Sequence, residues 1–440
     1  MIYGIIIYVL IMLLISFYDM KKIKSFEDYS LAGKNQSFIF VFASLMATMI
    51  GASATIGIGD KVVEIGFPAF WWLFVGAFGM IAQALFISEK IRNLNANTLP
   101  DIANITVGKE AKTLLAVIIP ISWIGIVSAQ FVALTKIIRH YSKDIGENKI
   151  LIIVAVTVII YTLVGGQISV IKTDMLQAWV IALGIIATFL YLFINSGNNG
   201  EVFSQIELFN HKFRINDLIA TLLVVGGTYF LGPDIISRNL VSKDSKTAKK
   251  AALTSGVCLG VFAVIVTLAA LWAVINCDGL SGENPLIYIM NNNLPKPLAV
   301  LFCLTLISTI VSSADTCLVN AATIIENDLL KKNKVWHVRI IILIIGLIAL
   351  VMSINNKDVI GLLTGAYSIY APGIVFPLLI AILCYGKRKV NKKLWFTGVL
   401  IGGTMGAVST YFGMGEWGIP LAGMMISLIF GVASVNPMKK

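Results

Sequence analysis

The fold of this chain is decided by the stretch Gly51-Ala52-Ser53-Ala54-Thr55-Ile56-Gly57-Ile58-Gly59, which interrupts an apolar run over residues 38–58. A second apolar run, over 216–234, is interrupted in the same way by Gly226-Gly227-Thr228-Tyr229-Phe230-Leu231-Gly232-Pro233. Glycine loosens a helix, and Pro233 removes a backbone donor and clashes with the preceding turn. Glycine in an apolar helix can also serve close packing between helices, so either stretch alone allows both interpretations.

The composition places most of the chain in a lipid bilayer. The chain has 440 residues, of which 58% are hydrophobic and 13% charged, whereas soluble domains are about 45–50% apolar and about 25% charged. Apolar runs of about 20 residues, long enough to cross a bilayer as helices, cover nearly all of it. We therefore expect an all-α integral membrane protein with about 13 transmembrane helices in one membrane domain, 1–440. The expected spans are 2–18, 38–58, 67–87, 113–137, 149–165, 174–195, 216–234, 251–276, 296–325, 338–354, 359–384, 394–412 and 418–436.

The basic residues predict the topology of these spans, because cytoplasmic loops carry most Lys and Arg. With the N-terminus outside, the segments expected in the cytoplasm hold 25 of the 34 Lys and Arg residues, and the odd span count puts the C-terminus in the cytoplasm. The net charge of +11 thus reflects topology, and we expect a multi-pass plasma-membrane protein with no nucleic-acid partner. The cytoplasmic segments are 19–37, 88–112, 166–173, 235–250, 326–339, 385–393 and 437–440.

The spacing of the two interruptions predicts an inverted repeat. They lie five spans apart, and because five is odd, two five-helix units in series insert upside down relative to each other. Paired interrupted helices in matching halves are typical of transporters that bind their solute near the middle of the membrane. We expect a 5+5 inverted repeat of the leucine-transporter type. Its repeats cover 38–195 and 216–384, and the peripheral helices cover 2–18, 394–412 and 418–436.

One face of the span 296–325 is polar. At 3.6 residues per turn, that face or its edges carry Ser308, Thr309, Ser312, Ser313, Asp315 and Thr316. Hydroxyls in membrane helices often bond back to the i−4 carbonyl, but a carboxylate in hydrocarbon is costly and usually lines an ion or solute path. A hard cation takes oxygen ligands, and carbonyls freed at a helix break supply them. The pattern predicts a sodium site between the spans 38–58 and 296–325.

Asp174 begins the span 174–195 and allows two interpretations. An aspartate at that position can cap the helix, because its carboxylate accepts backbone N–H bonds and complements the helix dipole. It can also face Asp315 across a polar cavity, where two carboxylates repel unless a cation or a proton lies between them. The pair would then be a second sodium site or a proton-coupled site.

Four stretches resemble motifs of the sodium:solute symporter family, which includes the sodium/proline, sodium/sugar, pantothenate and sialic acid carriers. The resemblance runs from about Ser25 to Cys384, and the order and spacing of the motifs make it specific. The first is Ser25-Phe26-Glu27-Asp28-Tyr29-Ser30-Leu31-Ala32-Gly33-Lys34, and the second is Gly165-Gly166 through Val170 with Thr173-Asp174 and Gln177. The third is Tyr229-Phe230 through Pro233-Asp234-Ile235-Ile236-Ser237-Arg238, and the fourth is Ser312-Ser313-Ala314-Asp315.

The resemblance implies a symporter that uses the sodium gradient to take up a small organic solute by alternating access, with Na⁺ as the coupling ion. It implies sodium ligands at the backbone oxygens of Ala47, Ile50 and Thr309 and at the hydroxyls of Ser312 and Ser313. The positions that match a second cation site of some relatives are Asp174, Asp315 and Thr316. Met49 and Ala54 stand where sugar carriers have polar residues, which argues against a hexose.

Nine residues near the interrupted spans are candidates to line the solute site, although aromatic side chains also pack or lie at membrane interfaces. The basic residues fall outside the middle of the expected spans, so the exposed N–H groups of the half-helices would have to hold a carboxylate. We expect an amino acid or a carboxylate as solute. The candidates are Ser53, Thr55, Phe70, Trp71, Gln130, Thr228, Tyr229, Tyr367 and Tyr370.

Other classes of function fit less well. A membrane enzyme needs a nucleophile–base pair or a His-rich metal set inside the bilayer, and His140, His211 and His337 fall at span ends or in loops. A channel needs pore rings, whereas two internal breaks suit alternating access. A membrane sensor with a transporter-like domain, or a proton-coupled carrier that uses Asp315, stays open. We expect the protein to function as a monomer, with the solute and the bilayer as its partners.

Overall fold

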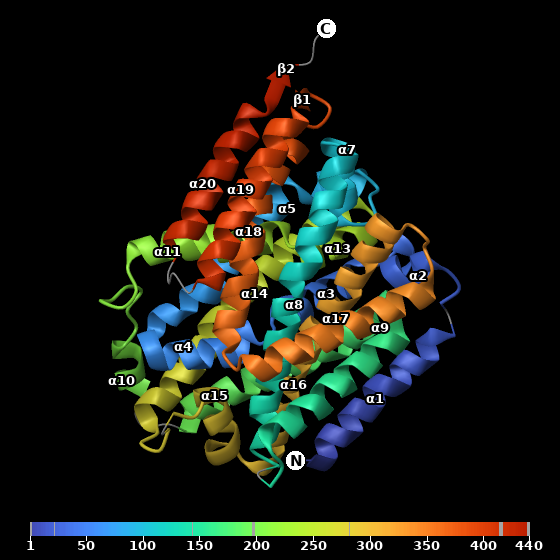
Figure 1. Ribbon diagram of the computed structural model, residues 1–440. Helices are drawn as coiled ribbons and strands as arrows, with labels where there is room; N and C mark the ends of the chain where they lie inside the picture. Colours follow the sequence, from blue (N-terminus) through green and yellow to red (C-terminus); the bar gives the residue numbers. More distant parts are fainter. Residues whose placement is uncertain are drawn as a thin grey trace.

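The computed structural model describes residues 2–21, 23–142, 144–195, 199–280, 282–412 and 417–437, which form a helical bundle with one small sheet (Figure 1). The helices of the first half are α1 (Ile2–Met20), α2 (Phe26–Leu31), α3 (Phe38–Met49), α4 (Ile58–Ile65), α5 (Trp71–Phe86), α6 (Ser88–Asn93), α7 (Leu99–Thr106), α8 (Lys109–Arg139), α9 (Glu147–Asn195) and α10 (Asn199–Ser204). Those of the second half are α11 (Ile215–Thr221), α12 (Gly227–Leu231), α13 (Pro233–Val241), α14 (Ser245–Asn276), α15 (Pro285–Tyr288), α16 (Lys296–Ile324), α17 (Val335–Asn355), α18 (Val359–Cys384), α19 (Lys392–Tyr411) and α20 (Gly418–Ala433).

Short 3₁₀-helices (η1 and η3) and π-helices (η2, η4, η5 and η6) join several of these helices. They are η1 (Ala32–Lys34), η2 (Ser53–Gly57), η3 (Phe67–Phe70), η4 (Leu222–Gly226), η5 (Ile289–Asn293) and η6 (Ile325–Leu330). The strands β1 (Arg388–Val390) and β2 (Val435–Pro437) pair antiparallel, with Lys389 opposite Asn436. This hairpin-like sheet ties the start of α19 to the end of α20.

Within the described residues, nine helices are long and apolar enough to cross a membrane, and the bent pair α3 and η2–α4 makes a tenth. The sequence predicted about thirteen spans, and that exact number is not confirmed. The two expected spans 149–165 and 174–195 are joined in α9, and α19 and α20 fall short of the same criteria of length and hydropathy.

Gly166 divides α9. The helix has 49 residues, which at about 1.5 Å per residue makes about 74 Å, more than twice the thickness of a bilayer core. Gly166 is non-helical, with φ 57° and ψ −171°, and a Cβ at that position would lie 2.6 Å from the ring of Tyr29. The left-handed backbone and the aromatic neighbour both require glycine there. The segments before and after Gly166 are each long enough to cross the bilayer.

The polar loops gather on two opposite faces. On one face, Arg92 Nε donates to Ser242 O over 2.6 Å, and Lys112 pairs with Asp328 at 3.0 Å. On the other, Lys136 pairs with Asp60 at 3.0 Å and Tyr141 donates to Asn291 over 2.7 Å. Each contact joins two loops that the span count places on the same side of the membrane.

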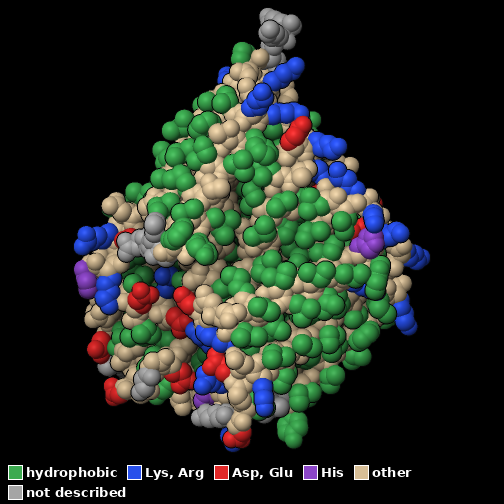
Figure 2. Space-filling view, in the orientation of Figure 1, with side chains coloured by type: hydrophobic (Ala, Val, Ile, Leu, Met, Phe, Trp, Pro, Cys, Tyr) green, Lys and Arg blue, Asp and Glu red, His purple; other side chains and the backbone are tan. Residues whose placement is uncertain are grey.

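Charged side chains are unevenly distributed over the surface. Figure 2 shows Lys and Arg along the upper and right-hand edge, near β1, α7 and α2, and most Asp and Glu of this view at the lower left, near α4 and α15. A broad hydrophobic band lies between them (Figure 2). Exposed apolar residues of α9 and α17, such as Ile153, Ile160, Ile344 and Ile348, are typical of a surface that faces lipid.

Both predicted interruptions are breaks in the structure. α3 ends at Met49, Ile50 has φ −91° and ψ 81°, and the chain then turns by 54° into η2 and α4. In the second half, α12 ends before Gly232, whose ψ of 133° is extended, and Pro233 begins α13. Helix α16 packs against α3, α8 and α9, and nearly all of its residues from Phe302 to Ile324 are buried. The helices on either side of the two breaks, α3 and α13, therefore both contact the buried part of α16.

Candidate functional site

The hydroxyls of Ser312 and Ser313 reach across from α16 to the broken end of α3. Ser312 Oγ lies 2.8 Å from Ala47 O, and Ser313 Oγ lies 2.8 Å from Thr48 O. Both hydroxyls also lie 3.1 Å from Thr309 O on their own helix. Each hydroxyl has one hydrogen, so it can donate to only one of these carbonyls at a time. Five oxygens, two hydroxyl and three carbonyl, thus converge on the point where α3 ends.

The break of α3 leaves no room for a side chain next to this cluster. A Cβ at Gly51 would lie 2.6 Å from Ser313 Oγ. The predicted ligands Ala47, Thr309, Ser312 and Ser313 are therefore brought together, and the Thr48 carbonyl joins them. The carbonyl of Ile50 makes no backbone or side-chain hydrogen bond with the described residues.

The cluster fits a sodium ion by its chemistry. All five donor atoms are neutral, hard oxygens, which are the ligands that hard cations prefer in proteins. They are buried, and two of the carbonyl donors belong to the last turn of α3, where a helix leaves its carbonyls without intrahelical partners.

Arg238 occupies the space beside Asp174. Both residues are fully buried, and Arg238 Nη2 lies 3.2 Å from Asp174 Oδ2 and 2.6 Å from Thr316 Oγ1. The same nitrogen lies 3.3 Å from Thr48 Oγ1, and Ser44 donates its hydroxyl to Asp174 Oδ2. A guanidinium therefore already balances Asp174, and Thr316 is one of its acceptors. Arg238 lies inside the bundle, although the positions of the basic residues predicted that it lies in the cytoplasmic segment 235–250.

Asp315 lies one residue before Thr316 and is also fully buried. Neither of its carboxylate oxygens has a hydrogen-bond partner among the described residues. Asp174 and Arg238 are both within electrostatic range, and Tyr161 is a close neighbour whose hydroxyl donates to Thr173 over 2.7 Å. An isolated carboxylate in this environment is costly unless it holds a proton or a cation.

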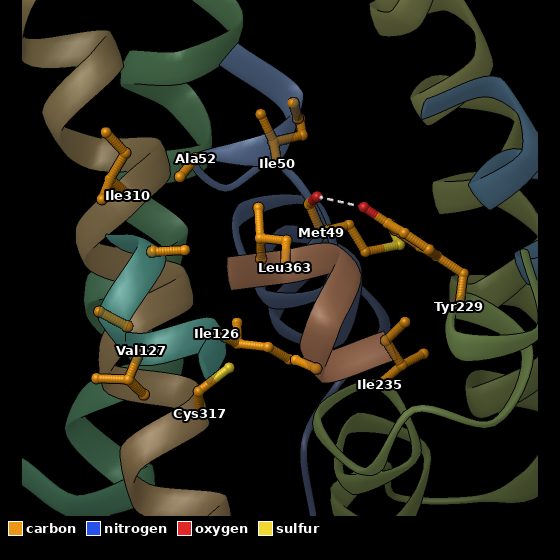
Figure 3. Packing of buried hydrophobic residues seen from close by; sticks show 14 of the residues in the cluster. Met49, Ile50, Ala52, Ile126, Val127, Tyr229, Ile235, Ile310, Cys317 and Leu363 are labelled. Carbon is orange, nitrogen blue, oxygen red and sulfur yellow. Dashed lines mark hydrogen bonds between the residues drawn. The ribbon is translucent and has the colours of Figure 1, made fainter. Parts of the chain in front are cut away.

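A small cavity of about 40 Å³ lies beside the hydroxyl cluster. It is lined by Thr48, Met49, Gly51, Ser53, Trp123, Ile126, Gln130, Thr228, Tyr229, Asp234, Ile235, Ser313, Cys317 and Tyr367. Figure 3 shows five of these lining residues, Met49, Ile126, Tyr229, Ile235 and Cys317, with the hydrogen bond from Tyr229 to the Met49 carbonyl, which is 3.2 Å long. Five of the nine predicted solute-site residues line this cavity: Ser53, Gln130, Thr228, Tyr229 and Tyr367.

The other four candidates lie outside the cavity wall. Thr55 bonds back to the Gly51 carbonyl at 3.1 Å, and Tyr370 donates to Leu231 O and packs edge-on against Trp123. Phe70 packs against Phe74, with ring centroids 4.4 Å apart. Trp71 donates its indole N–H to Leu208 O over 2.9 Å.

Three residues of this region were not among the site residues predicted from the sequence: Trp123, Asp234 and Arg238. Two of them lie in the stretch Pro233-Asp234-Ile235-Ile236-Ser237-Arg238, whose opposite charges are spaced one helical turn apart. That spacing puts both on one face of α13. Opposite charges at this spacing, directly after the predicted break at Gly232 and Pro233, are the sequence signal that could have indicated a buried polar site.

One protein-family model matches most of this chain. The model of the sodium:solute symporter family matches residues 29–402. This chain belongs to the sodium:solute symporter family. It is therefore a secondary transporter embedded in the plasma membrane, which couples the sodium gradient to the movement of a small solute, and it is not an enzyme.

Known proteins resemble the symporter along nearly its whole length. The osmoregulated proline transporter OpuE of Bacillus subtilis is 25% identical over 411 residues, which are 87% of this chain and 83% of the relative. A solved Na⁺-coupled sialic acid symporter, in a substrate-bound outward-open state, has a TM-score of 0.81 and 16% identity, with 100% of this chain and 98% of that chain covered. MhsT in complex with L-phenylalanine has a TM-score of 0.64 and 13% identity, with 91% and 99% covered. The symporter thus has the leucine-transporter fold expected from its sequence.

Proposed function

We propose that the symporter binds its coupling sodium between α3 and α16 and takes up a small amino-acid-like solute through the cavity next to that site. The observation that carries the proposal is the contact of the Ser312 and Ser313 hydroxyls with the Ala47 and Thr48 carbonyls, at the break of α3. A sodium ion among these oxygens replaces hydrogen bonds by ion–dipole contacts, for which the hydroxyls turn their lone pairs inward. The proline transporters among the relatives support an amino acid as solute.

The position of this site explains how an ion could couple to a solute. α3 contributes Thr48 and Met49 to the cavity, and the break and η2 that follow it contribute Gly51 and Ser53. Sodium that fixes the end of α3 against α16 also fixes these cavity residues. Binding of the ion then raises the affinity for the solute, and by linkage the solute raises the affinity for the ion.

The test is uptake into proteoliposomes, with and without an inward sodium gradient, by the wild type and by Ser312→Ala/Ser313→Ala. Each lost hydroxyl ligand of a charged group is worth about 1.5–3 kcal/mol, so the half-saturating sodium concentration should rise by about tenfold or more. The matched control is Ser353→Ala, because Ser353 is also a buried span serine whose hydroxyl contacts carbonyls of its own and another helix, Ala349 and Ser128. An unchanged sodium dependence in the double variant places the sodium site elsewhere.

The unpartnered carboxylate of Asp315 supports a second candidate function, in which protons also couple to uptake. Arg238 forms its ion pair with Asp174, so that among the described residues of this cluster Asp315 is the carboxylate without an ion pair. Asp315→Asn should then flatten the pH dependence of uptake and lower the number of cations moved per solute. Reversal potentials of wild type and variant measure that ratio, and an equal ratio in both leaves Asp315 as a structural residue of a sodium symporter.

A further inference from the structure

Asp234 is the one residue with a formal charge among the described residues that line the small cavity beside the hydroxyl cluster. The other lining side chains are apolar, hydroxyl, amide, thiol or aromatic. Its neighbour in the first turn of α13 is Pro233, so the carboxylate lies at the break between α12 and α13. The N-terminal end of α13 stabilises its negative charge. Among the described residues, the one formal charge on the cavity wall is thus negative and lies on the side of the second broken helix.

Within the described residues, the hydrogen bonds of the Asp234 carboxylate come from backbone N–H groups in the first turn of α13. No side chain among the described residues hydrogen-bonds to Asp234 or forms an ion pair with it. The nearest candidate is Arg238, one turn further along α13, but its guanidinium binds Asp174, Thr316 and Thr48 through Nη2 and Ser237 through Nη1. Arg238 thus forms its ion pair with Asp174 of α9 rather than with Asp234.

The rest of the cavity wall suits a positively charged nitrogen. Trp123, Tyr229 and Tyr367 line it together with Asp234, and the faces of aromatic rings attract organic cations. On the side of α3, Gln130 accepts a hydrogen bond from Ala52 N through Oε1 at 2.9 Å. Its amide nitrogen makes no hydrogen bond within the described residues and remains a donor for a carboxylate or hydroxyl of a solute.

We propose that Asp234 binds a positively charged nitrogen of the transported solute, so that the symporter accepts amino acids, betaines or other amines and rejects solutes without such a nitrogen. This inference rests on the proposed sodium-coupled uptake through the same cavity. It narrows the expected solute, because a simple carboxylate would face the Asp234 charge without a group to offset it. Burial makes that repulsion stronger than it is in water.

The test compares solutes with their carbon isosteres in proteoliposomes under an inward sodium gradient. Proline is paired with cyclopentanecarboxylate, and choline with 3,3-dimethylbutan-1-ol, so that each pair differs in the charged nitrogen and little else. Sodium-driven accumulation should occur for a nitrogen-bearing member and not for its isostere. Equal accumulation of an isostere overturns the proposal. If no solute of either kind responds to sodium, the proposed function itself fails.

Variants of Asp234 separate recognition from coupling. Asp234→Asn should raise the half-saturating concentration of the nitrogen-bearing solute by about tenfold or more, with the sodium-induced rise in melting temperature unchanged. Asp234→Glu, which keeps the charge, should retain selectivity against the isosteres. The matched control is Asp244→Asn, which removes an acidic charge from the N-terminus of α14 outside the cavity and should leave uptake unchanged. Wild-type affinity in Asp234→Asn contradicts the proposal, and if that variant does not fold, Asp234→Glu and the isostere pairs still decide.

Discussion

At the residue scale, the least expected feature of the symporter is the buried ion pair of Arg238 with Asp174. Removing both charges from water costs several kcal/mol per ion, and their attraction repays this only with good additional hydrogen bonds. Thr316, Thr48, Ser44 and Ser237 supply those bonds. The pair connects α13 with α9, and its bonds to hydroxyls reach α3 and α16.

We predict that Arg238→Met destabilises the protein by about 3–5 kcal/mol, because it leaves Asp174 buried without a countercharge. Asp174→Asn in the same chain should recover much of this loss, since both charges are then gone. Thermal unfolding of the purified protein in detergent measures both effects. Lys249→Met is the control, because the ion pair of Lys249 with Glu89 is partly exposed and such pairs contribute little. A melting temperature of Arg238→Met equal to that of wild type would show that the pair is dispensable.

The sequence predicted the hydroxyl pair but not the arginine, for a physical reason. Ser312 shares a helical face with Asp315, and Ser313 lies beside that face; this periodicity is visible without a structure. Arg238 follows the break at Gly232 and Pro233, where an apolar run ends, so the rule that basic residues lie in the cytoplasm assigned it to a loop. Its burial depends on partners far away in the sequence, Asp174 and Thr316.

At the element scale, the break of α3 depends on close contact with α16. Gly51→Ala puts a methyl group where Ser313 Oγ lies within 2.6 Å of it. Overpacking of this kind typically costs about 1–3 kcal/mol, and here the cost falls on the proposed sodium ligand. We predict a higher half-saturating sodium concentration for uptake in Gly51→Ala. Gly146→Ala is the control, because a Cβ there meets no atom within 4 Å. Equal sodium dependence of uptake in both variants would show that the break of α3 does not contribute to sodium binding.

The helices also show which span boundaries can be predicted from the sequence and which cannot. Both interruptions were predicted from glycine and proline, and both are breaks, at Ile50 and at Gly232. The sequence separated the spans 149–165 and 174–195, whereas a single non-helical residue, Gly166, divides α9. Hydropathy identifies apolar runs. It does not predict a break at a single residue such as Gly166, because that break depends on a contact with a side chain far away in the sequence, the Tyr29 ring.

At the scale of the whole molecule, the two polar faces make the topology testable. We predict that Glu207→Cys reacts with an impermeant maleimide in intact cells, and that Lys243→Cys reacts only after permeabilisation. Both positions are exposed and lie on opposite faces of the expected topology. The native Cys277, which is partly exposed, is first replaced by serine. The reverse labelling pattern would invert the orientation of every span.

The central claim is that sodium binds between α3 and α16, and thermal unfolding in sodium tests it without knowledge of the solute. A ligand that binds only the folded state stabilises it by about 2.7 kcal/mol at one hundred times its Kd. The melting temperature of wild type and of Ser353→Ala should rise with NaCl relative to equal KCl and saturate, whereas Ser312→Ala/Ser313→Ala should show no such rise in the same range. A sodium-specific rise in the double variant equal to that of wild type would contradict the account.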